Sequence, residues 1–288
     1  MRRFELMEPT SLAEACALLA EREDSRAIAG GTALLVLIKL GLYIPTLLVN
    51  LKKVRGASDV ADAPDGGLRL GALASVYDVE TAAAVRERYP LLAQACHVVA
   101  NIRIRNLATI GGNVAHGDYQ SDPPTALLAL DAAVELTDGR RARQVALADF
   151  LLGPYETAIE PGELVAAISV PPLAPGCRGT YLKFTTRSSE DRPCAGVAAL
   201  VRTEDGRCAE ARLAVGAVSP VPVRVRRAEE LARGERLTPA LIEAMAAEAT
   251  HAVEPMDDLR GPADYKRQVV GVLARRALAA CVANGATA

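Results

Sequence analysis

The stretch Thr109-Ile110-Gly111-Gly112-Asn113-Val114-Ala115-His116 decides how the rest of this chain is interpreted. Adjacent glycines let a backbone turn tightly and approach a ligand without a Cβ in the way. Pro123-Pro124 follows, and then an apolar run at 126–130 that predicts a buried helix. A strand-like segment, a glycine turn, a polar loop and a helix would cradle a phosphate or a polar ring. An ordinary surface turn fits this stretch alone equally well.

A second glycine pair, Ala29-Gly30-Gly31-Thr32-Ala33, favours the cradle. Residues 26–29 predict a short buried strand and residues 34–40 an apolar helix. Glycines at a strand-to-helix junction present free N–H groups, which form an anion site. Thr32 is expected to cap this helix or to donate its hydroxyl to a phosphate. The chain has no Gly-x-Gly-x-x-Gly fingerprint and no Walker lysine motif, so two unrelated loops suggest a dinucleotide held between two lobes.

The two loops resemble the paired flavin-binding motifs of the FAD-binding medium subunit of molybdenum hydroxylases. This family includes the medium subunits of carbon monoxide dehydrogenase and is related to the FAD domain of xanthine dehydrogenase. Further motifs in the same order extend the resemblance over nearly the whole chain: Ala-His-Gly-Asp at 115–118, Glu-Pro-Gly-Glu-Leu at 160–164, Tyr-Leu-Lys-Phe at 181–184 and Asp-Leu-Arg-Gly-Pro-Ala-Asp-Tyr-Lys at 258–266.

The order of the expected elements predicts an α+β protein of two domains. Residues 1–176 are expected to form an FAD-binding domain, of PCMH type as the resemblance implies, with α/β lobes at about 1–56 and 57–176. The proline-rich segment 171–176 is the clearest linker and marks the boundary. Residues 177–288 are expected to form a three-stranded antiparallel sheet followed by helices, similar to the C-terminal domain of carbon monoxide dehydrogenase flavoproteins.

Composition limits the possible partners. The chain has 288 residues, is 50% hydrophobic and carries a formal net charge of −2, which provides no strong attraction to nucleic acid or anionic membrane. The most membrane-like stretch, 34–51, contains Lys39, Gly41 and Pro45, and no secretory signal is apparent at the N-terminus. We therefore expect a cytoplasmic protein with no nucleic-acid partner and no integral membrane segment.

The titratable side chains predict binding rather than catalysis. None of the six cysteines forms a Cys-x-x-Cys pair, which favours buried free thiols over metal ligands. The three histidines are far apart in sequence, and His97, among apolar residues, is predicted to lie in the core. With no catalytic residue and no metal site expected, the iron–sulfur clusters that the resemblance implies must lie on another polypeptide.

The resemblance also implies which residues contact FAD. The first glycine loop is expected to hold the pyrophosphate: Ala29, Gly30, Gly31, Thr32, Ala33 and Leu34. The second loop and the polar residues after it are expected to hold the ribityl chain and the rest of the dinucleotide: Thr109, Gly112, Asn113, Ser121 and Asp122.

The ring walls complete this expected site. Ile104 and Ala108 would line a wall for the flavin or adenine, and Leu164 or Val165 the adenine side. Lys183 would approach the isoalloxazine as a cation, although a strand-surface lysine is the alternative. His116 would touch the flavin or only support the loop.

The segment around Asp191 places polar groups beside the ring. Carbon monoxide dehydrogenase medium subunits carry a His where this chain has Thr32, and a Tyr that covers the flavin near Asp191. No aromatic residue occurs between Phe184 and Val201. These differences argue against carbon monoxide as the substrate and suggest a different gate at the flavin edge.

The resemblance implies an FAD-binding electron-transfer subunit of a molybdenum-containing hydroxylase. Its expected partners are a large molybdenum-cofactor subunit and a small iron–sulfur subunit, in a heterotrimer that is doubled. Exposed arginines are expected at the interface: Arg103, Arg105, Arg187 and Arg192. A self-contained flavin oxidase and a non-catalytic nucleotide-binding module are the alternatives.

Overall fold

The first lobe is a small parallel sheet with one helix packed on it. In this computed structural model, which describes residues 3–283, the N-terminal elements are β1 (Glu5–Met7), α1 (Leu12–Glu21), β2 (Ser25–Ile28), α2 (Leu34–Lys39), β3 (Leu47–Asn50) and the 3₁₀ helix η1 (Leu51–Lys53). The strands lie in the order β1-β3-β2 with both pairs parallel. Ser11 caps α1 by accepting a hydrogen bond from the Glu14 N–H at 3.2 Å.

The second lobe has an antiparallel five-stranded sheet. Its order is β4-β5-β10-β6-β7. The strands are β4 (Val60–Asp62), β5 (Leu68–Gly71), β6 (Ala133–Thr137), β7 (Ala142–Ala146) and β10 (Leu164–Val170), and a separate hairpin joins β8 (Leu151–Gly153) to β9 (Glu156–Thr157). The helices are α3 (Val76–Thr81), α4 (Ala83–Arg88), α5 (Pro90–His97), α6 (Ile102–Arg105), α7 (Ile110–Ala115), α8 (Asp122–Ala129) and α9 (Leu147–Phe150). Every residue of α8 is buried, as its apolar run predicted.

The C-terminal sheet contains four strands, so the prediction of three was wrong. It consists of β11 (Arg178–Phe184), β12 (Ala195–Glu204), β13 (Arg207–Gly216) and β14 (Val223–Arg224), all antiparallel in that order. β14 has only two residues and follows a Pro-Val-Pro segment, so it carries too little pattern to be recognised. Asp205 and Gly206 form the β12–β13 turn with φ of 50° and 74°, as an Asp-Gly hairpin requires.

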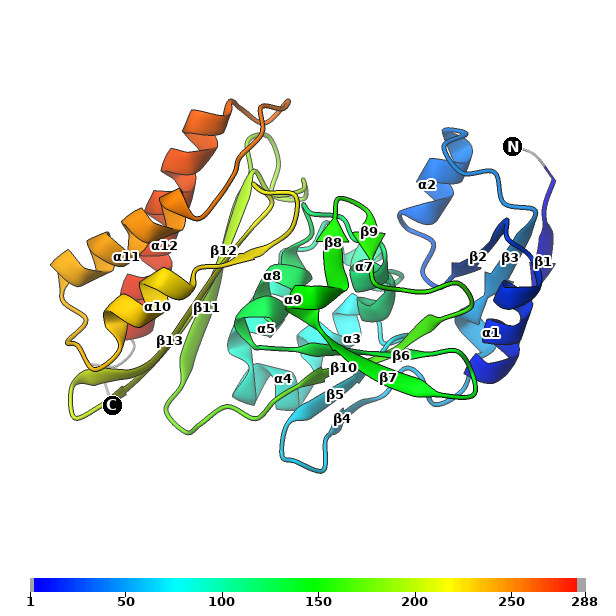
Figure 1. Ribbon diagram of the computed structural model, residues 1–288, viewed down its shortest axis with the longest axis horizontal. Coiled ribbons are helices and arrows are strands. Elements are labelled where there is room, and N and C mark those ends of the chain that lie inside the picture. The colour runs from blue at the N-terminus through cyan, green and yellow to red at the C-terminus, as the bar shows by residue number, and fades with distance from the viewer. Residues whose placement is uncertain (1–2, 284–288) are drawn as a thin grey trace.

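Three helices follow and cover the outer face of this sheet. They are α10 (Arg226–Ala232), α11 (Pro239–His251) and α12 (Ala263–Ala283), drawn in yellow to red on the left of Figure 1. The other face of the sheet packs against α5 and α8, so Tyr181 and Leu200 belong to the same buried cluster as Leu127. The first lobe lies at the opposite end of the molecule (Figure 1). No helix among residues 3–283 is both long and apolar enough to span a bilayer.

Two predictions about polar residues near α5 and α6 were wrong. The His97 side chain is 68% exposed, with Nδ1 2.8 Å from Glu80 Oε1. Residues 102–105 form the helix α6, whose N-cap is Asn101. This helix directs Arg105 inward, where its Nε donates to Glu80 Oε2 at 2.8 Å. Arg105 therefore neutralises a buried carboxylate of its own chain and is not available to a partner.

A buried ion pair joins the N-terminal region to the C-terminal sheet. Asp122, the first residue of α8, accepts from Lys183 Nζ at 3.0 Å and from Tyr181 Oη at 2.8 Å. Lys183 also donates to the Val98 carbonyl at 2.8 Å. Burial raises the pKa of Asp122 to about 6, although Lys183 opposes the shift. Burying the two charges costs desolvation free energy, which is offset because Asp122 and Lys183 form an ion pair and a hydrogen bond with each other.

We predict that Lys183→Met destabilises the protein by about 3 kcal/mol at pH 8, because it leaves a buried carboxylate without its cation. The loss of unfolding free energy should be smaller at pH 5 than at pH 8. The pKa of Asp122 in the folded state is already above its unfolded value, and removal of Lys183 raises it further. Protonation at low pH therefore favours the folded variant. Urea unfolding at both pH values measures the difference.

Arg275→Met provides the control, since Arg275 and Glu243 form a solvent-exposed pair at 3.1 Å and such pairs contribute little. A Lys183→Met loss that is the same at pH 5 and pH 8 would contradict the assignment of an uncompensated Asp122 carboxylate.

Candidate cofactor-binding site

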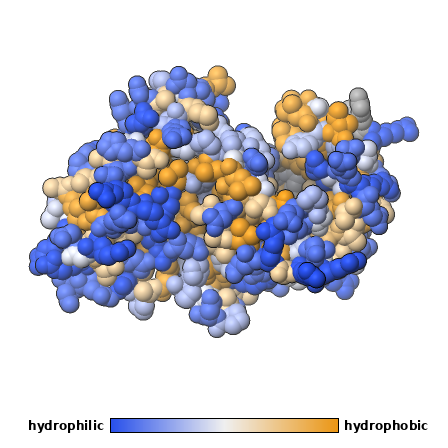
Figure 2. Space-filling model, viewed as in Figure 1, coloured by the Kyte–Doolittle hydropathy of each residue, from blue (hydrophilic) through white to orange (hydrophobic). Residues whose placement is uncertain are grey.

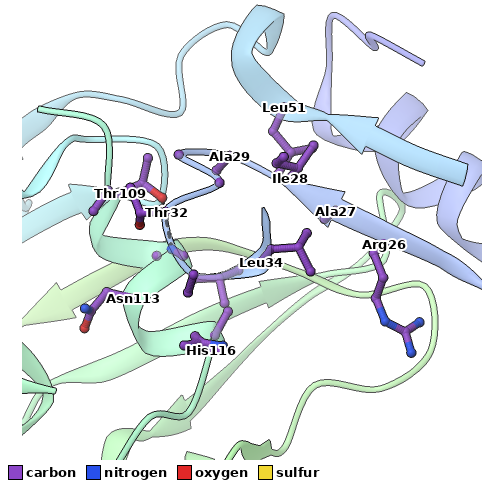
Figure 3. A pocket seen from close by; sticks show the side chains of 18 of the residues that line it. Arg26, Ala27, Ile28, Ala29, Thr32, Leu34, Leu51, Thr109, Asn113 and His116 are labelled. Atoms are coloured by element: carbon purple, nitrogen blue, oxygen red, sulfur yellow. Dashed lines mark hydrogen bonds between the residues drawn. The ribbon is translucent and has the colours of Figure 1, made fainter. Parts of the chain in front are cut away.

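A cavity of about 830 Å³ lies between the first two lobes. The first lobe supplies its lining residues from 26–34, and the second supplies them from 108–116 and from the start of β10. Figure 3 shows the two loops facing each other across this space, with Leu34 beside His116. The volume falls within the range of cofactor and ligand pockets, about 300–1,000 Å³.

Gly30 is where the two loops touch. A Cβ on Gly30 would lie 2.0 Å from the Leu107 carbonyl oxygen and 2.9 Å from Ala108 Cα, so no other residue fits without moving the backbone. Gly31 has φ of +70°, a conformation that glycine adopts without penalty. The first pair is therefore required by the contact between the lobes as well as by the turn.

The first loop carries unused donors. Within the part of the chain that the structure describes, the N–H groups of Gly30, Gly31, Thr32 and Ala33 donate to no protein acceptor. They lie between the end of β2 and the first turn of α2, and all four residues line the cavity. Backbone donors grouped in this way bind anions. The expected capping role of Thr32 is wrong, because α2 begins after Ala33 and has no side-chain cap.

The sequence predicted a loop turn at the second glycine pair, and this was wrong. The pair instead lies in the first turn of the helix α7. Thr109 is the N-cap and its Oγ1 accepts from the Gly112 N–H at 3.1 Å. The Ile110 and Gly111 N–H groups donate to the Ala74 and Ala72 carbonyls at 2.9 and 3.0 Å. The donors of this loop are thus already used within the protein.

The two glycines of α7 have different neighbours. A Cβ on Gly111 would lie 2.5 Å from Ala72 Cβ, so Gly111 permits close packing on the β5–α3 connection. A Cβ on Gly112 would meet only Thr109 within 4 Å, with Oγ1 at 2.6 Å, and Gly112 lines the cavity. Both glycines line the cavity, but only at Gly112 does a side chain have open space beyond Thr109.

Most of the residues expected at the site do line this cavity. They are Ala29, Gly30, Gly31, Thr32, Ala33, Leu34, Ala108, Thr109, Gly112, Asn113, His116, Leu164 and Val165. They come from both lobes and from β10, which are far apart in sequence. The arrangement of two glycine loops around one cavity is what the sequence predicted.

Five expected residues lie away from the cavity lining. Ile104 packs against the core of the second lobe. Asp191 forms an ion pair with Arg187, with Oδ2 3.4 Å from Nε. Ser121 lies behind Asn113, since its Oγ donates to Asn113 Oδ1 at 2.8 Å. Asp122 and Lys183 form the buried pair described above, so the ammonium group of Lys183 already has two acceptors. Their direct contact with a cofactor remains a prediction.

Several lining residues were not expected from the sequence. Leu37, Leu42, Leu51 and Leu73 make the cavity apolar, and Arg26 lies over the Tyr43 ring at 5.5 Å. Tyr155 reaches the cavity from the β8–β9 turn. Only the Gly153-Pro154 turn signal preceding Tyr155 marked that position, and it gave no indication of distance to the glycine loops.

His116 ends α7 and packs on Tyr155, with ring centroids 5.2 Å apart and an interplanar angle of 55°. Burial lowers the pKa of His116, which keeps the imidazole neutral at pH 7. The nearby Asp118 carboxylate is paired with Arg192 at 2.9 Å. Arg192 is thus paired within the chain, but its side chain is still 53% exposed, so its expected place at an interface stays a prediction.

The residues present fit a dinucleotide. The first loop offers backbone donors for a pyrophosphate, Gly112 leaves space beside it, and apolar side chains and two aromatic rings suit the ring systems. Among residues 3–283, no group of three His, Cys, Asp or Glu side chains is placed to hold a metal ion. Five of the six cysteines are buried and Cys177 is half-buried. The fold and site define a dinucleotide-binding protein of two lobes with an added C-terminal domain.

Comparison with known proteins identifies the family. Residues 2–173 match the FAD binding domain in molybdopterin dehydrogenase, and residues 180–281 match the CO dehydrogenase flavoprotein C-terminal domain. The chain is 33% identical to the nicotine 6-hydroxylase medium subunit of Paenarthrobacter nicotinovorans, over 94% of each chain. It is 31% identical to the glyceraldehyde dehydrogenase medium chain of Sulfolobus acidocaldarius, over 95% of this chain and 96% of that one.

A solved structure agrees. A chain of carbon monoxide dehydrogenase from Hydrogenophaga pseudoflava superposes with a TM-score of 0.94 at 34% identity, over 98% of both chains. The chain therefore belongs to the family of FAD-binding medium subunits of molybdenum hydroxylases.

We predict that Gly112→Val abolishes FAD binding while the protein still folds. The branched side chain would occupy the cavity beside the pyrophosphate, and nothing but Thr109 lies within 4 Å of its Cβ. Flavin absorbance per purified chain and circular dichroism measure the two properties. Full flavin occupancy in this variant would remove Gly112 from the site.

We predict that Gly30→Ala, in contrast to Gly112→Val, destabilises the folded protein. Its Cβ would overlap the Leu107 carbonyl, so we expect a loss of about 2–3 kcal/mol in unfolding free energy from overpacking between the lobes. A melting temperature equal to that of the unmodified protein would contradict the close contact.

Proposed function

We propose that this chain binds FAD in the cavity between its first two lobes and serves as the electron-transfer subunit of a molybdenum-containing hydroxylase. The observation that carries the proposal is the cluster of unused backbone donors from Gly30 to Ala33 facing Gly112 across an apolar cavity, in a chain of this family. FAD supplies the redox chemistry, since a flavin handles both one- and two-electron steps.

The residues of the chain bind and orient the cofactor. The first loop holds the pyrophosphate through its N–H groups, and Asn113, oriented by the Ser121 hydroxyl, contacts the polar chain of the dinucleotide. The leucines of α2 and β10 exclude water from the rings. Asp118 and Asp122 are held in ion pairs with Arg192 and Lys183, which suits a subunit whose substrate chemistry takes place elsewhere.

The partners follow from the family. Relatives of this chain are named as medium subunits or chains, and we propose a large molybdenum-cofactor subunit and a small iron–sulfur subunit, in a heterotrimer that is doubled. We place the partner surface near the glycine loops and segment 188–193, where Arg187 is exposed, as is Arg103 on α6. The cytoplasmic location stays a prediction.

Exposed apolar side chains support a heteromeric assembly. They gather on α2 and the loop after it: Leu35, Val36, Leu40, Leu42, Tyr43 and Ile44. Figure 2 shows this hydrophobic area at the upper right, over the first lobe. Contiguous exposed apolar patches on soluble proteins often mark interaction sites.

This chain does not identify the substrate on its own. Relatives of nearly equal identity are named for nicotine and for glyceraldehyde, so the choice of substrate belongs to another subunit. Thr32 in the first loop and the lack of an aromatic residue between Phe184 and Val201 argue against carbon monoxide.

We predict that the purified chain binds one FAD but oxidises no organic substrate by itself. The flavin absorbance spectrum measures binding, and anaerobic bleaching with candidate substrates measures reduction. A colourless preparation that ignores added FAD would support a nucleotide-binding module without flavin. Flavin turnover by the isolated chain would instead indicate a self-contained oxidase.

The assembly is tested separately by affinity purification of the tagged chain from its native host. Two further polypeptides should co-purify, one with molybdenum and one with iron–sulfur absorbance. Recovery of the chain alone, under conditions that preserve such complexes, would contradict the proposed partners.

A further inference from the structure

An aromatic pair forms part of the cavity wall where α7 ends. His116 is the C-cap of α7, and Tyr155 lies in the turn between β8 and β9. Both line the cavity and their rings are in contact. Tyr155 is nevertheless 51% exposed, so much of this lining residue is not covered by the protein.

The backbone holds Tyr155 in an unfavourable conformation. Its φ is +62°, in the left-handed region that bulky L-residues rarely adopt. Its N–H donates to the Gly117 carbonyl at 2.7 Å, and a Cβ on Gly117 would lie 3.2 Å from Tyr155 Cα. The segment after α7 and the β8–β9 turn are therefore packed closely, and this packing determines where the ring points. Such strain is found most often at functional sites.

The surface that the pair presents is aromatic and uncharged. Burial keeps the imidazole neutral by lowering the pKa of His116. Burial and then the Asp118 carboxylate raise the pKa of Tyr155, so the phenol is also neutral at pH 7. Arg192 neutralises Asp118 at 2.9 Å. A wall of this kind suits a heteroaromatic ring better than a phosphate or another charged group.

We propose that the Tyr155 ring, supported by His116, is a stacking platform for one heteroaromatic ring of the bound dinucleotide, which makes Tyr155 a cofactor-binding residue. The inference rests on the proposed binding of FAD in this cavity. The first glycine loop holds the pyrophosphate at the centre of the ligand, and FAD carries a ring at each end. The platform receives either the adenine or the isoalloxazine ring, both of which stack through a planar π-face.

The test measures dissociation constants of FAD, ADP and FMN for the full chain freed of its flavin. Tyr155→Asn removes the ring, and asparagine tolerates the left-handed backbone. It should weaken FAD binding by about ten- to a hundredfold, the usual effect of losing one base-stacking side chain. Tyr155→Phe keeps the ring and should bind FAD as the unmodified protein does. Tyr77→Asn, which changes an exposed tyrosine on α3 outside the cavity lining, is the matched control.

The two smaller ligands identify the ring. Weaker binding of ADP alone assigns adenine to the platform, and weaker binding of FMN alone assigns isoalloxazine. Tyr155→Gly, which also suits a φ of +62°, repeats the measurement if the asparagine variant is unstable. An FAD dissociation constant in both ring-deleted variants equal to that of the unmodified protein would overturn the platform. So would a Tyr155→Phe loss as large as that of Tyr155→Asn. Failure of the unmodified chain to bind FAD would contradict the proposed function itself.

Discussion

The close approach of Gly30 to the backbone of Leu107 and Ala108 is the contact on which the site depends. A side chain at position 30 would overlap the Leu107 carbonyl, so only glycine lets the first lobe sit this near to the second. The same contact sets the separation between the donors of residues 30–33 and the first turn of α7. The cavity is thus the space left between two lobes with different sheets, which touch beside it at Gly30.

Polar contacts at adjacent residues link the cavity to the C-terminal domain. Asn113 accepts from Ser121, and the next residue, Asp122, is paired with Lys183 on β11. Because Asp122 is fully buried, the pair is satisfied only when β11 packs against α5 and α8. Residues expected to touch the cofactor therefore also determine where the C-terminal sheet sits.

Much of this arrangement could be predicted from the sequence, because glycine pairs at element boundaries and apolar runs are local signals. The elements β2, α2 and α8 and most of the cavity lining followed from them, whereas α7 and β14 did not. The roles of the second loop, of His97 and of Arg105 did not. Whether a backbone N–H of the second loop can bind a ligand depends on the nearby Ala72 and Ala74 carbonyls. Whether an arginine can bind a partner depends on its pairing with Glu80 or Asp118. Those partners are set by packing and not by neighbours in sequence.

The two glycine loops have similar motifs but offer different groups to the cavity. In the first loop the donors face the cavity and the glycines permit the approach of the second lobe. In the second loop the donors are used by Ala74, Ala72 and Thr109, so its contribution is space at Gly112 and the side chain of Asn113. A charged pyrophosphate is stabilised where donors are free, whereas an uncharged polyol chain needs room and a few polar side chains. The loops are therefore not interchangeable, although each contains the same Gly-Gly pair.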